Sequence, residues 1–87
     1  MTIKVAIVED DDDYRTVLGR ALADRGLEVA LFPDAESLEA DMATVAPDVV
    51  LLDVNLPGIN GFAIAARLRA ISSVGIIMLT GRAPRED

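Results

Sequence analysis

The chain has 87 residues, enough for one small domain, and 52 % of them are hydrophobic but only 3 % aromatic, so the expected core is aliphatic. A net charge of −7 argues against direct binding to nucleic acid or to an anionic membrane. With no cysteine and no histidine, the chain has no disulfide, no zinc site of the usual kind and no histidine-based acid–base chemistry. We expect a cytoplasmic protein, because we find neither a signal-peptide pattern nor an apolar run of about 18 residues.

The first third of the chain predicts a strand and then a helix. Residues 3–8 are mostly apolar and β-branched, which favours a central strand. Five acids follow at residues 9–13, and a helix can begin among them because Asp is a good N-cap and acids favour the positive end of the helix dipole. Gly26 is placed to end this helix. The apolar face of the helix comprises Val17, Leu18, Ala21 and Leu22, with Arg15, Arg20, Asp24 and Arg25 elsewhere.

The middle of the chain repeats this alternation. Residues 27–32 predict a second strand, nearer the edge of the sheet because it carries an acid and a shorter apolar run. Residues 35–46 predict a helix that Pro47 ends. Residues 49–53 are four apolar residues followed by Asp53, a pattern typical of a strand that is covered on both faces.

The last third predicts one more helix and one more strand. After the Pro57-Gly58 turn, Asn60 can cap a third helix. The expected buried stripe of this helix is Phe62, Ala65, Leu68 and Ile71. Residues 75–79 predict a fourth buried strand, and Pro84 suits the first turn of a fourth helix.

Alternating apolar strands and helices are typical of an α/β fold with a parallel sheet and right-handed crossovers. All strands then point the same way, so the residues that follow them meet at one edge, where open α/β sheets bind ligands. These residues are Glu9, Asp10, Asp53 and Thr80. Each has a structural explanation on its own, as a helix start or a strand end, but their convergence predicts a functional site.

The chemistry of these side chains indicates a metal and a phosphoryl group. Three carboxylates repel one another unless a cation lies between them, and oxygen ligands without His or Cys favour Mg²⁺. A carboxylate beside Mg²⁺ can act as a nucleophile toward phosphorus. Thr80 could donate a hydrogen bond to a phosphoryl oxygen, small Gly81 would leave room beside it, and Asn55 would offer a metal its backbone carbonyl.

Three segments together resemble the receiver domain of two-component response regulators. The resemblance runs in order from residue 3 to the last residue and implies an open, doubly wound, flavodoxin-like parallel sheet with strand order 2-1-3-4. The segments are Val8-Glu9-Asp10-Asp11, Leu51-Leu52-Asp53-Val54-Asn55-Leu56-Pro57-Gly58 with Gly61, and Met78-Leu79-Thr80-Gly81.

The resemblance also implies a role for each site residue. Asp53 would be the phospho-acceptor, and the donor would be a sensor histidine kinase or a phosphotransfer protein. Glu9 and Asp10 would bind Mg²⁺, assisted by Asp53 and the carbonyl of Asn55. Thr80 would be the switch hydroxyl. Such a domain accepts a phosphoryl group and is not a turnover enzyme.

The chain also departs from the family pattern. A complete receiver continues through a fifth strand, whose tip carries a lysine, and a fifth helix, whereas the only lysine here is Lys4. We therefore expect residues 1–87 to be a single receiver domain truncated within the fourth helix, without an output domain. The missing elements would leave the fourth strand and the first-helix face uncovered, which predicts self-association through them.

Two other functions remain as alternatives. A receiver-like module could work through protein contacts without phosphorylation. A phosphohydrolase that forms an aspartyl-phosphate is disfavoured, because it would want a second acid at the position of Asn55. A dinucleotide-binding sheet is also disfavoured, because the loop after the first strand is acidic and has no Gly-x-Gly.

Overall fold

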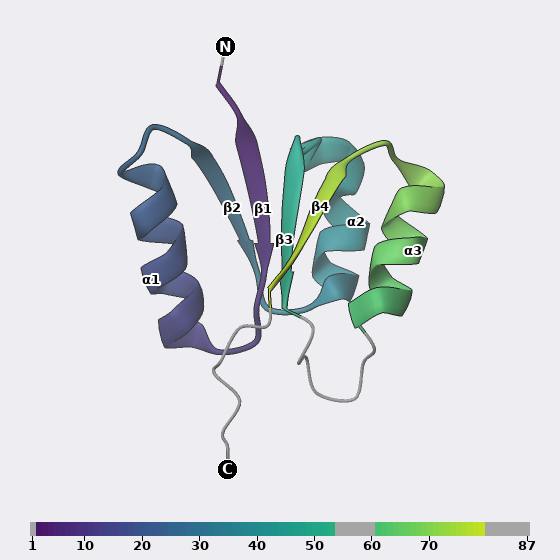
Figure 1. The fold of residues 1–87 in the computed structure, drawn as a ribbon, viewed down its shortest axis with the longest axis horizontal. Helices are drawn as coiled ribbons and strands as arrows, with labels where there is room; N and C mark the ends of the chain where they lie inside the picture. Colours follow the sequence, from purple (N-terminus) through teal and green to yellow (C-terminus); the bar gives the residue numbers. More distant parts are fainter. Residues whose placement is uncertain (1, 54–60, 80–87) are drawn as a thin grey trace.

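The computed structural model describes residues 2–53 and 61–79, in which strands and helices alternate. The described elements are β1 (Lys4–Val8), α1 (Asp12–Ala23), β2 (Glu28–Phe32), α2 (Ala35–Val45), β3 (Val49–Asp53), α3 (Gly61–Ile71) and β4 (Gly75–Leu79). The described strands form one parallel sheet in the order β2-β1-β3-β4 (Figure 1). The predicted α/β fold and strand order are confirmed, including the central place of β1 and the edge place of β2.

The sheet has a helical layer on each side, and the two layers differ in how much they bury. Figure 1 shows α1 on one side of the sheet and α2 and α3 on the other. The main hydrophobic cluster lies on the side of α2 and α3. On the α1 side Val5 and Ile7 of β1 are also buried, but on α1 itself only Gly19 is. The buried residues of the main cluster are Ala6, Val8, Phe32, Ala35, Leu38, Val50, Leu52, Ile64, Ala65, Leu68 and Val74.

Local sequence signals explain where α1 begins and ends. Asp11 is the N-cap, and its carboxylate accepts a hydrogen bond from the Tyr14 N–H at 2.8 Å. At the other end Gly26 has a φ of 89°, its N–H donates to the Ala23 carbonyl at 3.0 Å, and the Leu27 N–H donates to the Leu22 carbonyl at 3.3 Å. This pair of bonds is the Schellman pattern, so the prediction that Gly26 ends the helix is confirmed.

The termini of α2 are formed by an aspartate and an alanine. Asp34 is the N-cap, and its Oδ1 accepts hydrogen bonds from both the N–H and the hydroxyl of Ser37, each at 2.7 Å. These two bonds hold the pKa of Asp34 below its ordinary value of 3.8. At the C-terminus Ala46 lies in the left-handed region with a φ of 47°, directly before Pro47.

The predicted buried stripe of α3 is only half right. Ala65 and Leu68 are buried, together with Ile64, but Phe62 is 68 % exposed and Ile71 is 64 % exposed. On a helix with 3.6 residues per turn, a residue three positions further along lies about 60° around the axis from the first. Phe62 and Ile71 stand at opposite ends of such a row, about 180° apart, and the sheet covers only its middle.

No helix among residues 2–53 and 61–79 has the length and apolar character needed to cross a membrane.

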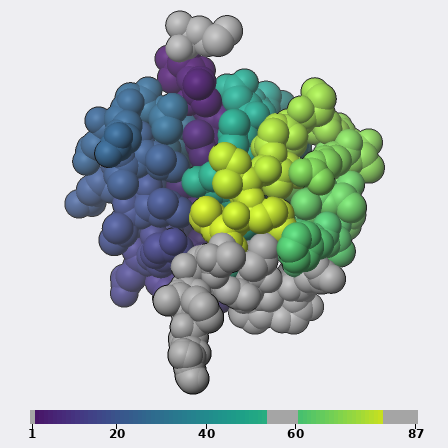
Figure 2. Space-filling model, in the orientation of Figure 1, coloured from purple at the N-terminus to yellow at the C-terminus, as the bar shows by residue number. Residues whose placement is uncertain are grey.

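The fourth strand differs from the prediction of a buried element. Gly75 and Ile77 are exposed, and Ile77 is 52 % exposed, whereas Ile76 and Met78 pack against the core. Figure 2 shows β4 at the surface between α1 and α3. The predicted cap Asn60 and the predicted fourth helix lie outside the described residues.

Candidate functional site

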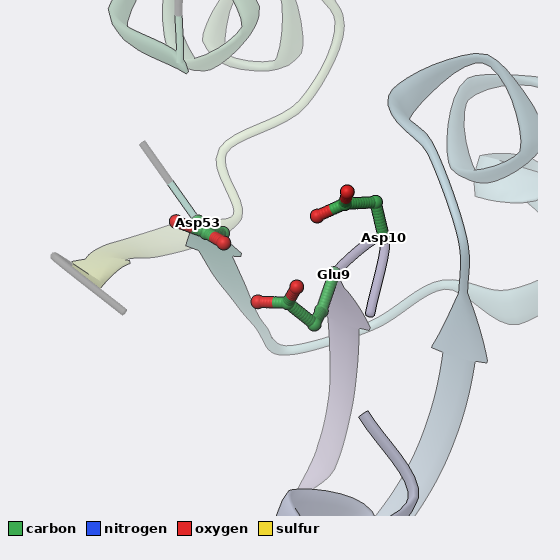
Figure 3. A group of neighbouring side chains, drawn as sticks. All are labelled: Glu9, Asp10 and Asp53. Carbon is green, nitrogen blue, oxygen red and sulfur yellow. The ribbon is translucent and has the colours of Figure 1, made fainter. Parts of the chain in front are cut away.

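Two neighbouring strands bring three carboxylates together at the carboxyl edge of the sheet. β1 and β3 pair with Val8 opposite Leu52, so Glu9, the next residue, lies beside Asp53 at the end of β3. One carboxylate oxygen each of Glu9, Asp10 and Asp53 lies within 4.8 Å of the others. Figure 3 shows the side chains of Glu9 and Asp10 directed toward Asp53. The structure therefore brings together the three acids that were expected at this edge.

Three hydrogen bonds hold Glu9: two join its backbone to β2 and α1, and one joins its side chain to the N-cap residue Asp11. The Glu9 N–H donates to the carbonyl of Phe32 on β2 at 3.0 Å. Nη1 of Arg15 on α1 donates to the Glu9 carbonyl at 2.7 Å, and the Asp11 N–H donates to Oε2 of Glu9 at 2.9 Å. Glu9 thus has both its main chain and its side chain fixed before any ligand arrives.

The electrostatics of the cluster follow from burial and crowding. Glu9 and Asp53 are fully buried, whereas Asp10 is exposed. Loss of solvation, followed by a hydrogen bond to Asp53 that favours the protonated acid, raises the pKa of Glu9 to about 7. The hydrogen bond from the Asp11 N–H acts in the opposite direction. Near neutral pH a proton on Glu9 therefore relieves the repulsion between buried carboxylates.

These residues fit a hard divalent cation. The three acids offer oxygen ligands only, as Mg²⁺ prefers, and they are close enough for one ion to contact all of them. The exposed Asp10 gives the site an open side, where an ion can keep water ligands or meet a phosphate oxygen. A cation would also replace the proton as the charge that balances Glu9 and Asp53.

Three of the predicted site residues cannot be compared with the structure. Asn55, Thr80 and Gly81 lie outside the described residues. Conversely, Arg15 was assigned from the sequence only to the part of the helix away from its apolar face, but it contacts the backbone of Glu9. The available signal was its place one turn into a helix that begins in an acidic run.

Comparison with protein families gives one match that covers nearly the whole chain. Residues 5–87 match the family described as the response regulator receiver domain. The chain is 42 % identical to the transcriptional regulatory protein CseB of Streptomyces coelicolor, across 95 % of this chain and 36 % of CseB. It is 34 % identical to the DNA-binding response regulator MtrA of Mycolicibacterium smegmatis, across 100 % of this chain and 38 % of MtrA. The chain thus spans about a third of the length of these relatives.

The fold is shared with solved receiver domains. The chain matches the BeF3-activated N-terminal receiver domain of RstA from Klebsiella pneumoniae with a TM-score of 0.78 and 32 % identity. The match covers 86 % of this chain and 64 % of that one.

Proposed function

Because the chain belongs to the receiver domains of response regulators, we propose that it is a signalling switch that accepts a phosphoryl group on Asp53. The donor is a sensor histidine kinase or a phosphotransfer protein. Mg²⁺ is required, with Glu9, Asp10, Asp53 and the Asn55 carbonyl as its protein ligands. The observation that carries the proposal is the buried Asp53 carboxylate at a strand end, within 4.8 Å of two other carboxylates.

The transfer can be written with the chain's own residues. A carboxylate oxygen of Asp53 attacks the phosphorus of a phosphohistidine on the donor, so an O–P bond forms and the N–P bond breaks. The imidazole nitrogen keeps the electron pair of the broken bond and takes a proton from solvent. When bound, Mg²⁺ supplies positive charge to the phosphoryl oxygens. Asp53 sits on a strand rather than on a loop, which holds the nucleophile in place for in-line attack.

The phosphorylated state is then read by the residues around it. Thr80 donates a hydrogen bond to a phosphoryl oxygen, and Gly81 leaves space for that oxygen. The chain is consumed stoichiometrically in this step, so it is a phospho-acceptor and not a turnover enzyme.

Intact-mass measurement tests the proposal directly. The chain is incubated with Mg²⁺ and acetyl phosphate, a small acyl-phosphate donor, and we expect a mass increase of one phosphoryl group. Omission of Mg²⁺ and the Asp53→Asn substitution should each abolish the increase. Asp10→Asn, which removes a ligand but not the nucleophile, should slow the reaction without moving its site. BeF3, with which the RstA receiver domain was activated, provides a second probe of this chain.

Two results would contradict the proposal. Phosphate retained by Asp53→Asn would place the acceptor elsewhere. A folded wild-type chain that never gains mass would favour the alternative, a receiver-like module that acts through protein contacts alone.

A further inference from the structure

We infer that Arg15 is a positioning residue, which fixes the peptide between Glu9 and Asp10 so that both carboxylates face the cation site. This inference rests on the proposed function, because it concerns the same Mg²⁺ site. It adds a residue of α1 that lies outside the expected ligand set and acts through the backbone of Glu9.

Arg15 contacts the peptide bond that joins two of the proposed metal ligands, Glu9 and Asp10. Nη1 of Arg15 donates to the Glu9 carbonyl at 2.7 Å. That carbonyl and the N–H of Asp10 belong to one planar peptide unit. A hydrogen bond to the carbonyl therefore fixes the orientation of this plane, and with it the direction from which the Asp10 side chain extends. Since the Glu9 N–H is bound to Phe32 on β2, the Arg15 bond completes the restraint on the Glu9 main chain.

The guanidinium is itself held in place. Nη2 of Arg15 pairs with the carboxylate of Asp12, and only 15 % of the Arg15 side-chain surface is exposed. Asp12 is 85 % exposed, so this ion pair contributes little to stability by itself. The guanidinium is planar and rigid, so the bond from Nη2 to Asp12 also orients Nη1 toward the Glu9 carbonyl.

Charge and positioning make opposite predictions for this residue. A cation near a Mg²⁺ site repels the ion, so loss of the Arg15 charge alone should tighten Mg²⁺ binding. Loss of the hydrogen bond to Glu9 frees the Glu9–Asp10 peptide to rotate, so positioning predicts weaker binding. Partners that orient metal ligands typically change metal affinity by about 10–100-fold when they are removed.

The test is a Mg²⁺ titration of the 87-residue chain, followed through the backbone amide shifts of Asp10 and Asp53. We expect Arg15→Ala to weaken Mg²⁺ binding about ten-fold. Arg15→Lys should fall between the wild type and Arg15→Ala, because an ammonium can replace one hydrogen bond but not the fork. Arg20→Ala is the matched control: it removes the same charge from an exposed position of α1 and should leave the affinity within about two-fold of the wild type.

Thermal unfolding without metal shows that each variant is folded at the temperature of its titration, which separates positioning from a general loss of stability. Unchanged or tighter binding by folded Arg15→Ala, beside a wild type that binds, overturns the positioning role and leaves the proposed function standing. A wild-type chain that does not respond to Mg²⁺ overturns the proposed function and this inference with it.

Discussion

At the scale of single residues, the protonated and ionised forms of the Glu9 side chain suit the metal-free and the metal-bound site, respectively. Its protonated form suits the metal-free protein, because burial and the neighbouring Asp53 both oppose a negative charge there. Its ionised form is the one that binds a cation. With a pKa of about 7, raised from an ordinary value of 4.5, Glu9 changes between these states near neutral pH. In the proposed function, Mg²⁺ would therefore compete with the proton for this carboxylate.

This competition predicts how stability depends on pH. Between pH 4.5 and about 7 the folded chain holds a proton on Glu9 that the unfolded chain has released. The free energy of unfolding of the metal-free protein should therefore carry a contribution from Glu9 that is complete below pH 4.5 and is lost as the pH rises through 7. Urea denaturation at several pH values measures this loss.

Glu9→Gln and Mg²⁺ provide the controls for that measurement. Glu9→Gln cannot titrate, so its stability should fall less than that of the wild type over the same pH window. Added Mg²⁺ should stabilise the wild type more at about pH 8 than at about pH 5, because the ligand is already ionised at the higher pH. An equal effect of Mg²⁺ at both pH values would contradict competition at Glu9.

At the scale of the elements, α2 ends in a conformation that its sequence does not favour. Ala46 has a φ of 47°, although glycine is the usual residue in the left-handed position after a helix. The following Pro47 disfavours helical backbone at Ala46 and prefers it extended. The Ala46 N–H still donates to the Met42 carbonyl at 2.8 Å, so the helix is closed at the cost of some backbone strain.

Ala46→Gly should therefore stabilise the fold. Relief of the left-handed strain is worth about 1–2 kcal/mol, and the extra freedom of glycine in the unfolded chain offsets about 0.4–1 kcal/mol of it. We expect a net gain of about 0.5–1 kcal/mol in the free energy of unfolding, measured by urea denaturation.

The same substitution in the middle of α2 serves as the control. Ala40 is exposed, and Ala40→Gly should destabilise the chain by about 1 kcal/mol because the residue is in regular helix. Destabilisation by both substitutions would show that the strain at Ala46 is already relieved by its surroundings.

Local sequence pattern specifies some elements of this fold but not how they pack against one another. The strands and the end of α1 were predictable because apolar runs and Gly26 specify local structure directly. The α3 stripe was wrong at Phe62 and Ile71, because residue spacing indicates a helical face but not how far the sheet extends beneath it. The meeting of Glu9 and Asp53 followed from parallel topology, whereas the Arg15 bond to Glu9 depends on how α1 docks against the strand ends.

At the scale of the whole molecule, the two faces of the sheet are unequally covered. The main hydrophobic cluster lies on the side of α2 and α3. On the opposite side Val5 and Ile7 of β1 are buried, but Val17 of α1, Leu31 of β2 and Ile77 of β4 are 65 %, 43 % and 52 % exposed. Among the described strands, β4 pairs only with β3. An apolar strand at the edge of a sheet is a site at which another chain can add.

We therefore predict that the isolated chain self-associates through β4. Sedimentation equilibrium should give an average mass that rises with concentration above the 9.3 kDa of one chain. Ile77→Lys should shift the distribution to the monomer, because a charged side chain on an edge strand opposes pairing. Ile71→Lys is the matched control, since Ile71 is 64 % exposed on α3, and it should leave the association unchanged. If the wild type sediments as a monomer that unfolds cooperatively, or if both variants lose association equally, then β4 is not the contact.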